Sequence, residues 1–514
     1  MPVLLRGGLV ADGIAATTFR ADILIDGPLI AAVGPGLAAP DACEVTDLAP
    51  GSVVCPGFID AHAHAEGPLL AAGRVDGALA QGVTTLVVGQ DGQSWIGASQ
   101  ATAAYLSQYF GPVNGALAPP RDFSVADFGA AVSGRLAQNV AVLASQGTIR
   151  HNVAGAAAGP LGPAELAAAR RQVEAALAEG AVGLSSGLDY LPSRLAGPQE
   201  MAAVAAPLAG AGRPYVSHLR GYGPAVGAGL AELTEVGRRA GIRVHASHLW
   251  GAQPGIAAAF AAADAAAVPL TYDSYPYRRS SSILAMLVLP AELQAGGTAR
   301  TLAALAEPAR RAALLATGEL SEEFLSHVYL GCLPDAAAHF AGLSVTEAAR
   351  RSGRAAGEWV LDLLASSQLG VGAHLDRVGL SRSDIDWLAS GARQCAGSDG
   401  IYAGQHPHPR GYGAFARLAA HYLAAGPEAG YQQVARHLAA HAADVYGLRQ
   451  RGRIAPGLAA DLCVFGPGGP AERATYAEPR ALAAGVDLVL VGGEPVWQSG
   501  RPVPGRLPGQ LVSG

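Results

Sequence analysis

Lysine is absent from this chain of 514 residues, and all 35 of its basic side chains are arginine. The absence has a chemical consequence, because a carbamylated lysine cannot serve here as a bridge between two metal ions. Two dications held close together repel each other, so a binuclear site needs an anionic ligand between them. In this chain an ordinary carboxylate would have to fill that position.

Other features are scarce as well, and each shortage excludes a class of protein. The net charge is −6, so the chain has no basic footprint for nucleic acid. No apolar run approaches the ~20 residues of a membrane span, and the first residues do not resemble a signal peptide. The five cysteines lie far apart without a CxxC pair, which argues against a disulfide framework. We therefore expect a cytoplasmic protein whose partners are neither nucleic acid nor membrane.

Apolar residues make up 50% of the chain, enough for a large core. Apolar runs typical of buried parallel strands alternate with longer Ala-rich stretches typical of helices. There are eight such runs, at 57–62, 84–89, 140–145, 181–186, 214–218, 243–248, 269–273 and 394–399. Eight strands that alternate with helices predict an α/β fold with a (β/α)8 TIM-type barrel.

Both ends of the chain contain short strand-like runs broken by glycine and proline. The predicted domains are a small β-sandwich built from residues 1–54 and 446–514, and a barrel of residues 55–445. Two long segments do not fit a minimal barrel, at 92–139 after the second strand and 284–390 after the seventh. Within the latter, residues 284–350 predict a helical insertion that acts as a lid over the barrel mouth.

Potential metal ligands end several of these runs: His62, His64, Asp91, His218, His248 and Asp399. Residues i and i+2 of a strand share a face, so His62 and His64 can face one ion. Any one strand-end histidine is more often a hydrogen-bonded polar residue than a ligand, and Asp399 alone could form a turn or cap a helix. Together, six potential ligands at the carboxyl ends of barrel strands predict a metal site, because catalytic groups gather there.

Asp91 is the candidate for the bridging carboxylate, since it follows the second strand in the segment VVGQDGQSW. An ordinary Asp-Gly turn is the alternative interpretation. The expected cofactor is Zn²⁺, as one or two divalent ions, with other divalent metals possible. His245 is out of phase with His248 on its strand, and we expect it to face the outer shell of the barrel.

Motifs along nearly the whole chain resemble the N-acyl-D-amino-acid deacylases, or D-aminoacylases, of the amidohydrolase superfamily. They are, in order, GFIDAHAH, GVTTLVVG, GTIR, GAVGLSSGLDYLPS, VSHLRG, ASHLWG, YDSYPY, GSDG, HPRGYGAFARL and RGRIAPGLAADLCVF. HAH and the closing ADLCVF pattern occur across the superfamily, whereas GLDYLPS, YPY and HPRGYG are more specific to the deacylases. The resemblance implies a (β/α)8 barrel, a β domain from both chain ends and a mobile insertion after the seventh strand.

The resemblance also implies a role for individual residues. The metal-binding histidines of the family match His62, His64, His218 and His248, and its aspartate general base matches Asp399. Residues expected to bind the substrate are Tyr190, Tyr275, Ser281 and Arg410, of which Arg410 would hold the substrate carboxylate.

The chain departs from the family at the end of the second strand, where Asp91 takes the place of a metal-binding cysteine. A hard carboxylate instead of a soft thiolate should favour harder ions or fuller occupancy of two metal sites.

Two further departures concern the substrate pocket. Trp250 stands where the family often has a lysine, which removes one partner of a substrate carboxylate, and Gln146 stands where it often has a histidine. Arg278 or Arg279 could compensate for the lysine, although either could equally be a solvated surface residue.

The predicted reaction is hydrolysis of the amide bond of N-acyl amino acids, with D-amino acids favoured by the resemblance, to a carboxylate and a free amino acid. A bound dication would polarise the carbonyl and lower the pKa of its water to ~7, giving hydroxide. Asp399 would act as general base and then as general acid toward the leaving amine. The alternatives are a dipeptidase, a cyclic-amide hydrolase, an amino-sugar deacetylase or, less favoured, a non-catalytic scaffold. Stereochemistry, acyl group and oligomeric state are open.

Overall fold

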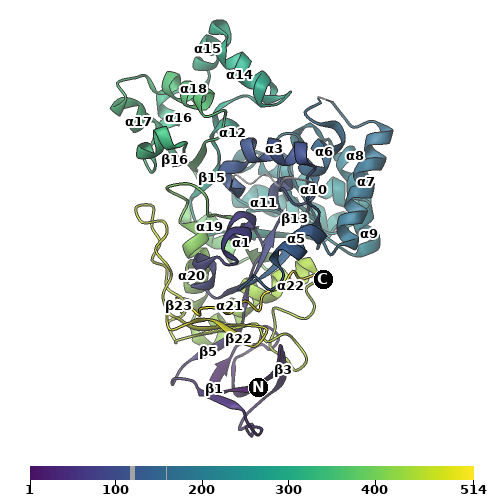
Figure 1. The fold of residues 1–514 in the computed structure, drawn as a ribbon, viewed down its shortest axis with the longest axis vertical. Helices are drawn as coiled ribbons and strands as arrows, with labels where there is room; N and C mark the ends of the chain where they lie inside the picture. Colours follow the sequence, from purple (N-terminus) through teal and green to yellow (C-terminus); the bar gives the residue numbers. More distant parts are fainter. Residues whose placement is uncertain (116–121, 158) are drawn as a thin grey trace.

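The structure is a computed structural model that describes residues 1–115, 122–157 and 159–514. Its long axis runs from a sheet that contains the N-terminus, at the bottom of Figure 1, to a group of helices that includes α14 (Thr298–Ala306) and α15 (Pro308–Leu315) at the top. An α/β region lies between them. No helix in the described part of the chain is long and apolar enough to cross a membrane.

The α/β region contains parallel strands at all eight predicted runs. These strands are β6 (Phe58–Asp60), β8 (Val83–Val88), β9 (Asn139–Val142), β10 (Ala144–Ser145), β11 (Leu184–Gly187), β12 (Tyr215–His218), β13 (Val244–Ala246), β14 (Leu270–Ser274) and β18 (Gln394–Ala396). The first three form one parallel sheet, and the others form a second in the order β10-β11-β12-β13-β14-β18. Both sheets are fully parallel, so the carboxyl ends within each lie along one edge.

Hydrogen bonds link the two parallel sheets. The amide of Leu143, between β9 and β10, donates to the carbonyl of Val88 at the end of β8 at 2.9 Å. The chain from β9 to β10 therefore stays beside β8. At the other edge, the amide of Ala61 donates to the carbonyl of Ala396 in β18 at 3.0 Å. The first and last strands of the series are therefore neighbours.

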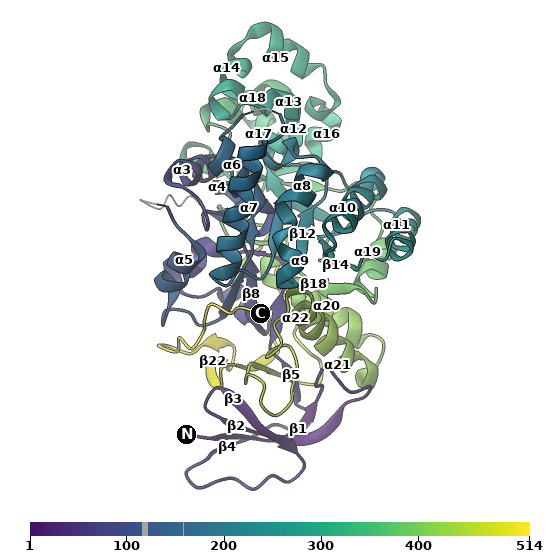
Figure 2. The same ribbon diagram turned by 90° about the vertical axis from the view of Figure 1, so that its right-hand side faces the viewer.

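Helices α7 (Pro163–Ala178), α10 (Val226–Ala240) and α11 (Gln253–Ala265) stand beside these strands in Figure 2. Their ends follow local rules: Pro163 begins α7, where a missing N–H costs nothing, and Gly241 ends α10 with a φ of 67°. The apolar faces of these helices pack on Leu184, Tyr215, Val244 and Leu270 from the strands to form one core.

The two chain ends share a nine-stranded sheet in the order β23-β22-β21-β20-β5-β1-β2-β3, with β4 beside β1. Its strands are β1 (Val3–Val10), β2 (Phe19–Asp26), β3 (Leu29–Gly34), β4 (Glu44–Asp47), β5 (Val53–Pro56), β20 (Leu462–Phe465), β21 (Val486–Val491), β22 (Glu494–Gln498) and β23 (Arg501–Pro502). The N-terminal and C-terminal segments meet where β5 pairs antiparallel with β20, with Cys55 opposite Cys463.

The segment after β14 contains a sheet in addition to the predicted helices. Strands β15 (Arg279–Ile283), β16 (Val328–Cys332) and β17 (Gly372–Asp376) pair antiparallel in the order β15-β17-β16. Its helices, among them α12 (Leu284–Val288) and α18 (Ala356–Ser366), pack around a separate apolar core. A second excursion, after β8, forms α3 (Gln100–Tyr109), α4 (Gly111–Asn114) and α5 (Val125–Val132).

One buried carboxylate joins the terminal sheet to the parallel strands. Asp461 accepts from the side-chain amide of Asn139 at the start of β9 (2.9 Å) and from the backbone of Gly492 between β21 and β22 (2.8 Å). Asp461 also pairs with Arg451 and is 3% exposed. Its side chain therefore satisfies three donors from three parts of the chain.

Replacing Asp461 by alanine should lower the free energy of unfolding by roughly 3 kcal/mol, because the buried donors and the arginine lose their acceptor. Urea unfolding followed by circular dichroism measures the change. The exposed Asp487 of β21 offers a matched control, and Asp487→Ala should shift stability by less than about 0.5 kcal/mol. Equal effects of the two substitutions would show that Asp461 does not join the two parts.

Candidate metal centre

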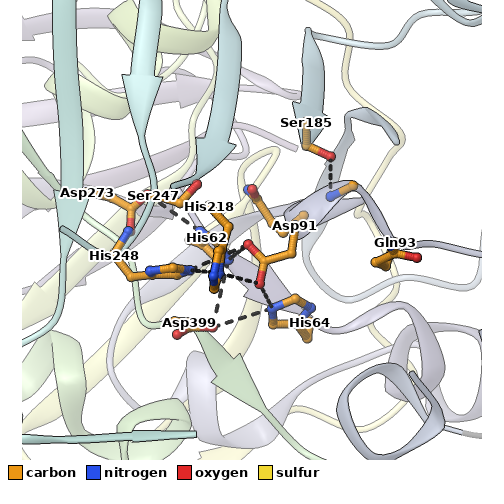
Figure 3. A network of polar contacts seen from close by, with 12 residues as sticks. His62, His64, Asp91, Gln93, Ser185, His218, Ser247, His248, Asp273 and Asp399 are labelled. Carbon is orange, nitrogen blue, oxygen red and sulfur yellow. Dashed lines mark hydrogen bonds and ion pairs between the residues drawn. The ribbon is translucent and has the colours of Figure 1, made fainter. Parts of the chain in front are cut away.

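The carboxylate of Asp91 lies between four histidine rings (Figure 3). Its Oδ1 is 3.5 Å from Nε2 of His62 and 3.5 Å from Nε2 of His248. Its Oδ2 is 3.7 Å from Nε2 of His64 and 3.6 Å from Nδ1 of His218. Ligand atoms thus fall into two groups, His62–His64–Asp91 and Asp91–His218–His248, which share the one carboxylate.

A tight turn after β8 positions this carboxylate. Gly89, Asp91 and Gly92 have φ values of 78°, 55° and 66°, a region that glycine and aspartate tolerate better than most residues. The amide of Gly89 donates to the buried carboxylate of Glu66 at 3.0 Å, and the amide of Gly92 donates to Oγ of Ser185 at 3.1 Å. The turn is thus held from two sides, and Asp91 extends its side chain toward the histidines.

Asp399 lies on another side of the histidine cluster. Its Oδ1 is 3.4 Å from Nε2 of His64 and 3.7 Å from Nε2 of His62. The amide of Asp399 donates to the carbonyl of His62 at 2.8 Å, and the next residues, β19 (Gly400–Ile401), pair with β7 (Ala63–His64). Asp91, His248 and Asp399 all have a positive φ, which is costly for residues other than glycine and is often found at functional sites.

Three histidine rings face side-chain oxygens that the sequence did not single out, and the contacts of His64 and His218 are hydrogen bonds. Nδ1 of His62 lies 3.5 Å from Asp273 Oδ2, Nδ1 of His64 lies 2.9 Å from Asn114 Oδ1, and Nε2 of His218 lies 3.3 Å from Asp189 Oδ2. Acceptors on the far ring nitrogen fix the tautomer and orientation of metal-binding histidines. Asp273 ends the predicted run 269–273, so its position in the sequence gave the same indication as the positions of the predicted ligands.

The expectation for His245 was wrong. The side chain is fully buried, and its Nε2 lies 3.1 Å from Asp273 Oδ2, the oxygen that also faces His62. Its Nδ1 meets the hydroxyl of Thr271 on the neighbouring strand at 2.8 Å. The alternation of side chains along a strand could not relate His245 to His248, because β13 ends at Ala246 and His248 lies beyond it with a φ of 33°.

Charges in the cluster depend on one another. Burial raises the pKa of Asp91, but His218 and His248 outweigh it and hold that pKa well below its ordinary value. Burial lowers the pKa of His62, yet Asp273, Asp91 and Asp399 raise it to about 9. Since the pKa values of His62 and His218 are raised, protons on these two imidazoles would offset part of the carboxylate charge, and divalent ions would displace those protons.

The residues fit a divalent metal. Both ring nitrogens of His62 and Oδ1 of Asp91 are buried without a hydrogen-bond partner in the described part of the chain. Such groups are costly to bury unless a ligand satisfies them. Each group offers three protein ligands, the number that catalytic zinc sites use, and these are imidazoles and a carboxylate, which bind zinc well.

A cavity of about 190 Å³ opens onto this centre. Asp91, Asp399 and three of the histidines form one wall, and Tyr190, Tyr275 and Ser281 line it as well. Apolar residues from distant segments complete the lining, namely Val113, Met286, Leu287, Leu375 and Ile401. The hydroxyl of Tyr190 forms a hydrogen bond of 2.7 Å with the hydroxyl of Ser282 on β15.

Arg410 lies behind the cavity wall instead of in it. It begins α20 (Arg410–Leu423), is fully buried and places Nη1 2.7 Å from Asp399 Oδ2. Its Nη2 donates to the carbonyl of Ser281 at 3.4 Å, and its guanidinium stands 4.7 Å from the ring centre of Tyr275. Burial raises the pKa of Asp399, but nearby positive charges, above all that of Arg410, outweigh burial and lower this pKa below its ordinary value.

Of the two arginines expected to compensate for Trp250, neither lines the cavity. Arg278 pairs with Asp376 at 2.5 Å, and its side chain is 58% exposed. The guanidinium of Arg279 lies 3.7 Å from the ring centre of Tyr329. Trp250 does line the cavity and stacks on Tyr222, with 6.1 Å between ring centres.

Comparison with known proteins supplies independent evidence. Residues 44–497 match the family described as "Amidohydrolase family". An N-acyl-D-glutamate deacylase from Alcaligenes xylosoxydans xylosoxydans is 29% identical over 521 residues, which cover 99% of this chain and 96% of that protein. A D-aminoacylase from the same organism is also 29% identical, over 96% of this chain and 94% of that protein.

A solved structure agrees with these relatives. The N-acyl-D-glutamate deacylase of Bordetella bronchiseptica, crystallised with zinc and a phosphonate that mimics the tetrahedral reaction intermediate, superposes with a TM-score of 0.82. It is 28% identical, and the alignment covers 100% of this chain and 99% of that one.

Substitutions at the centre should separate its two halves. His64→Ala and His218→Ala each remove a ligand from one group, so each should lower bound zinc by about one ion per chain. Asp91→Ala removes a ligand from both groups and should leave less than about one ion. Elemental analysis after dialysis measures the zinc content. Wild-type zinc content in the Asp91→Ala protein would contradict a shared ligand.

Proposed function

The chain belongs to the amidohydrolase family, and we propose that it is a metal-dependent deacylase of N-acyl amino acids with a linear amide bond. The favoured substrates are N-acyl-D-amino acids, since the relatives that match along their whole length include deacylases named for D-amino acids. The products are a carboxylate and a free amino acid. The single observation that carries the proposal is the Asp91 carboxylate among four histidines, at a centre that lines a cavity.

We propose that the parallel strands form one (β/α)8 barrel of residues 55–445. The hydrogen bond from Ala61 to Ala396 between the first and last strands supports closure. Residues 1–54 and 446–514 would form the small β domain that was predicted as a sandwich, and the strands that both segments contribute to one sheet support a common domain. Residues 284–350 would act as a lid, and Met286 and Leu287 from that segment already line the cavity.

The residues that would hold metal are His62, His64, Asp91, His218, His248 and Asp399. When bound, a divalent ion supplies Lewis acidity and lowers the pKa of water to ~7. Asp273, Asn114 and Asp189 keep the imidazoles oriented toward Asp91. Each oxygen of Asp91 faces one histidine of each ligand group, so the carboxylate lies between the two groups and could be a ligand that two ions share.

Asp399 would move the proton. Its Oδ1 faces the histidine cluster and its side chain lines the cavity, so one carboxylate oxygen can accept a proton from water and return it to the leaving amine. The other oxygen is held by Arg410 at 2.7 Å, which fixes the orientation of the carboxylate. The lowered pKa of Asp399 keeps it ionised and ready to accept a proton at neutral pH.

Tyr190, Tyr275, Ser281 and Arg410 would bind the substrate. The three hydroxyl side chains line the cavity and can meet the amide carbonyl or the carboxylate. Arg410 stands behind Tyr275 and would add positive charge to the end of the cavity that receives the carboxylate. The apolar lining favours an apolar amino-acid side chain or acyl group.

Asp399→Asn tests the proton-transfer role. An amide cannot take the proton, so kcat for N-acetyl-D-leucine should fall by about 10²- to 10⁴-fold. Zinc content should stay close to that of the wild-type protein, because the other five proposed ligands, the four histidines and Asp91, are unchanged. Steady-state kinetics and elemental analysis on the same sample provide both readouts.

Asp487→Asn, an exposed substitution in the terminal sheet, serves as the matched control and should leave kcat unchanged. Undiminished turnover in the Asp399→Asn protein would rule out this role for Asp399. Absence of hydrolysis by zinc-loaded wild-type protein toward a panel of N-acyl-D- and N-acyl-L-amino acids would rule out the proposed function itself.

A further inference from the structure

Arg377 is a buried cation without a carboxylate partner. The residue follows β17, is 4% exposed and forms no ion pair with the residues that the structure describes. The neighbouring Asp376 is paired with Arg278, and Asp399 is paired with Arg410. A buried charge of this kind costs several kcal/mol unless an opposite charge reaches it.

The guanidinium of Arg377 is nevertheless held in a fixed place. Its Nε donates to the carbonyl of Arg278 at 2.5 Å, and its Nη2 donates to the carbonyl of Tyr277. Its third nitrogen, Nη1, makes no hydrogen bond with the described residues. The side chain is therefore anchored on one side and has donor capacity left on the other.

The guanidinium of Arg377 lies directly behind two rings of the cavity wall. The guanidinium carbon of Arg377 lies 4.9 Å from the ring centre of Trp250 and 5.2 Å from that of Tyr275, and both rings line the cavity. Contact with two aromatic rings offsets part of the cost of burying the cation. It does not supply the missing negative charge.

Tyr275 lies beside both buried arginines. Arg410 stands 4.7 Å from its ring centre and Arg377 stands 5.2 Å from it. Burial raises the pKa of the Tyr275 hydroxyl, while the charges of Arg377 and Arg410 lower it, so both cations act at this hydroxyl. Only Arg410 has a carboxylate partner, which leaves one positive charge beside the cavity uncompensated.

We propose that Arg377 is the second cation that binds the carboxylate of the substrate, together with Arg410 and the hydroxyl of Tyr275. The proposal rests on the proposed function, because it names the group that receives the substrate carboxylate in that same site. Arg377 takes over the charge that a lysine at position 250 would supply, and the ring of Trp250 contacts its guanidinium. The positive charge thus comes from the segment after β14 instead of from the loop after β13.

Arg377→Gln removes the charge and keeps N–H donors for the carbonyls of Tyr277 and Arg278. The KM for N-acetyl-D-leucine should rise by about 10- to 100-fold, the effect of losing a hydrogen bond to a charged group. The change in kcat should stay within about threefold, because the lost contact exists before the reaction begins. Arg377→Lys should recover part of the loss, since it restores the charge without the planar fork.

A relocated charge separates binding from a structural role. The double variant Arg377→Gln with Trp250→Lys places an ammonium group in the cavity lining next to position 377. Its KM should be lower than that of Arg377→Gln and closer to the wild-type value. If Arg377 only stabilised the end of β17, a lysine at position 250 would not restore the KM. Circular dichroism verifies that each variant is folded.

Two results would overturn the inference alone: an unchanged KM in active Arg377→Gln protein, or no recovery in the double variant. Absence of hydrolysis by the wild-type protein would overturn the proposed function and this inference with it. The two failures are therefore distinguishable in one set of assays.

Discussion

The site depends on one shared carboxylate. Asp91 presents one oxygen to His62 and His248 and the other to His64 and His218. Without a lysine in the chain, the negative charge between two cations has to come from such a residue. The turn that carries Asp91 is fixed by Glu66 and Ser185, from segments before and after it, so the position of the carboxylate is a property of the fold.

The segments outside the parallel strands complete this centre. Asn114, from the excursion after β8, holds His64. The segment after β14 contributes Ser281 and Met286 to the cavity lining, and Arg377 lies behind Tyr275 of that lining. In the proposed function, the parallel strands would supply the groups for chemistry, and the insertions would supply groups that select the substrate. Such a division allows the substrate to change without disturbing the metal ligands.

The strands and the ligand cluster could be predicted from the sequence because both follow from local rules. Apolar runs mark buried strands, and parallel strands place their carboxyl ends at a common edge, so His218 and His248 could be expected to meet. The partners of those ligands could not be found in this way. Asn114 and Asp189 reach the histidines through irregular segments, His245 faces Asp273 against simple alternation, and the environment of Arg377 depends on contacts with residues about 100 positions earlier.

The most direct test of the account is the position of bound metal relative to Asp91. Anomalous diffraction at the zinc absorption edge, from crystals of the zinc-loaded protein, would locate the ions. The account predicts two peaks roughly 3.5–4 Å apart, one between Asp91, His62 and His64 and the other between Asp91, His218 and His248. A single peak, or peaks that the Asp91 carboxylate does not contact, would contradict the shared-carboxylate centre.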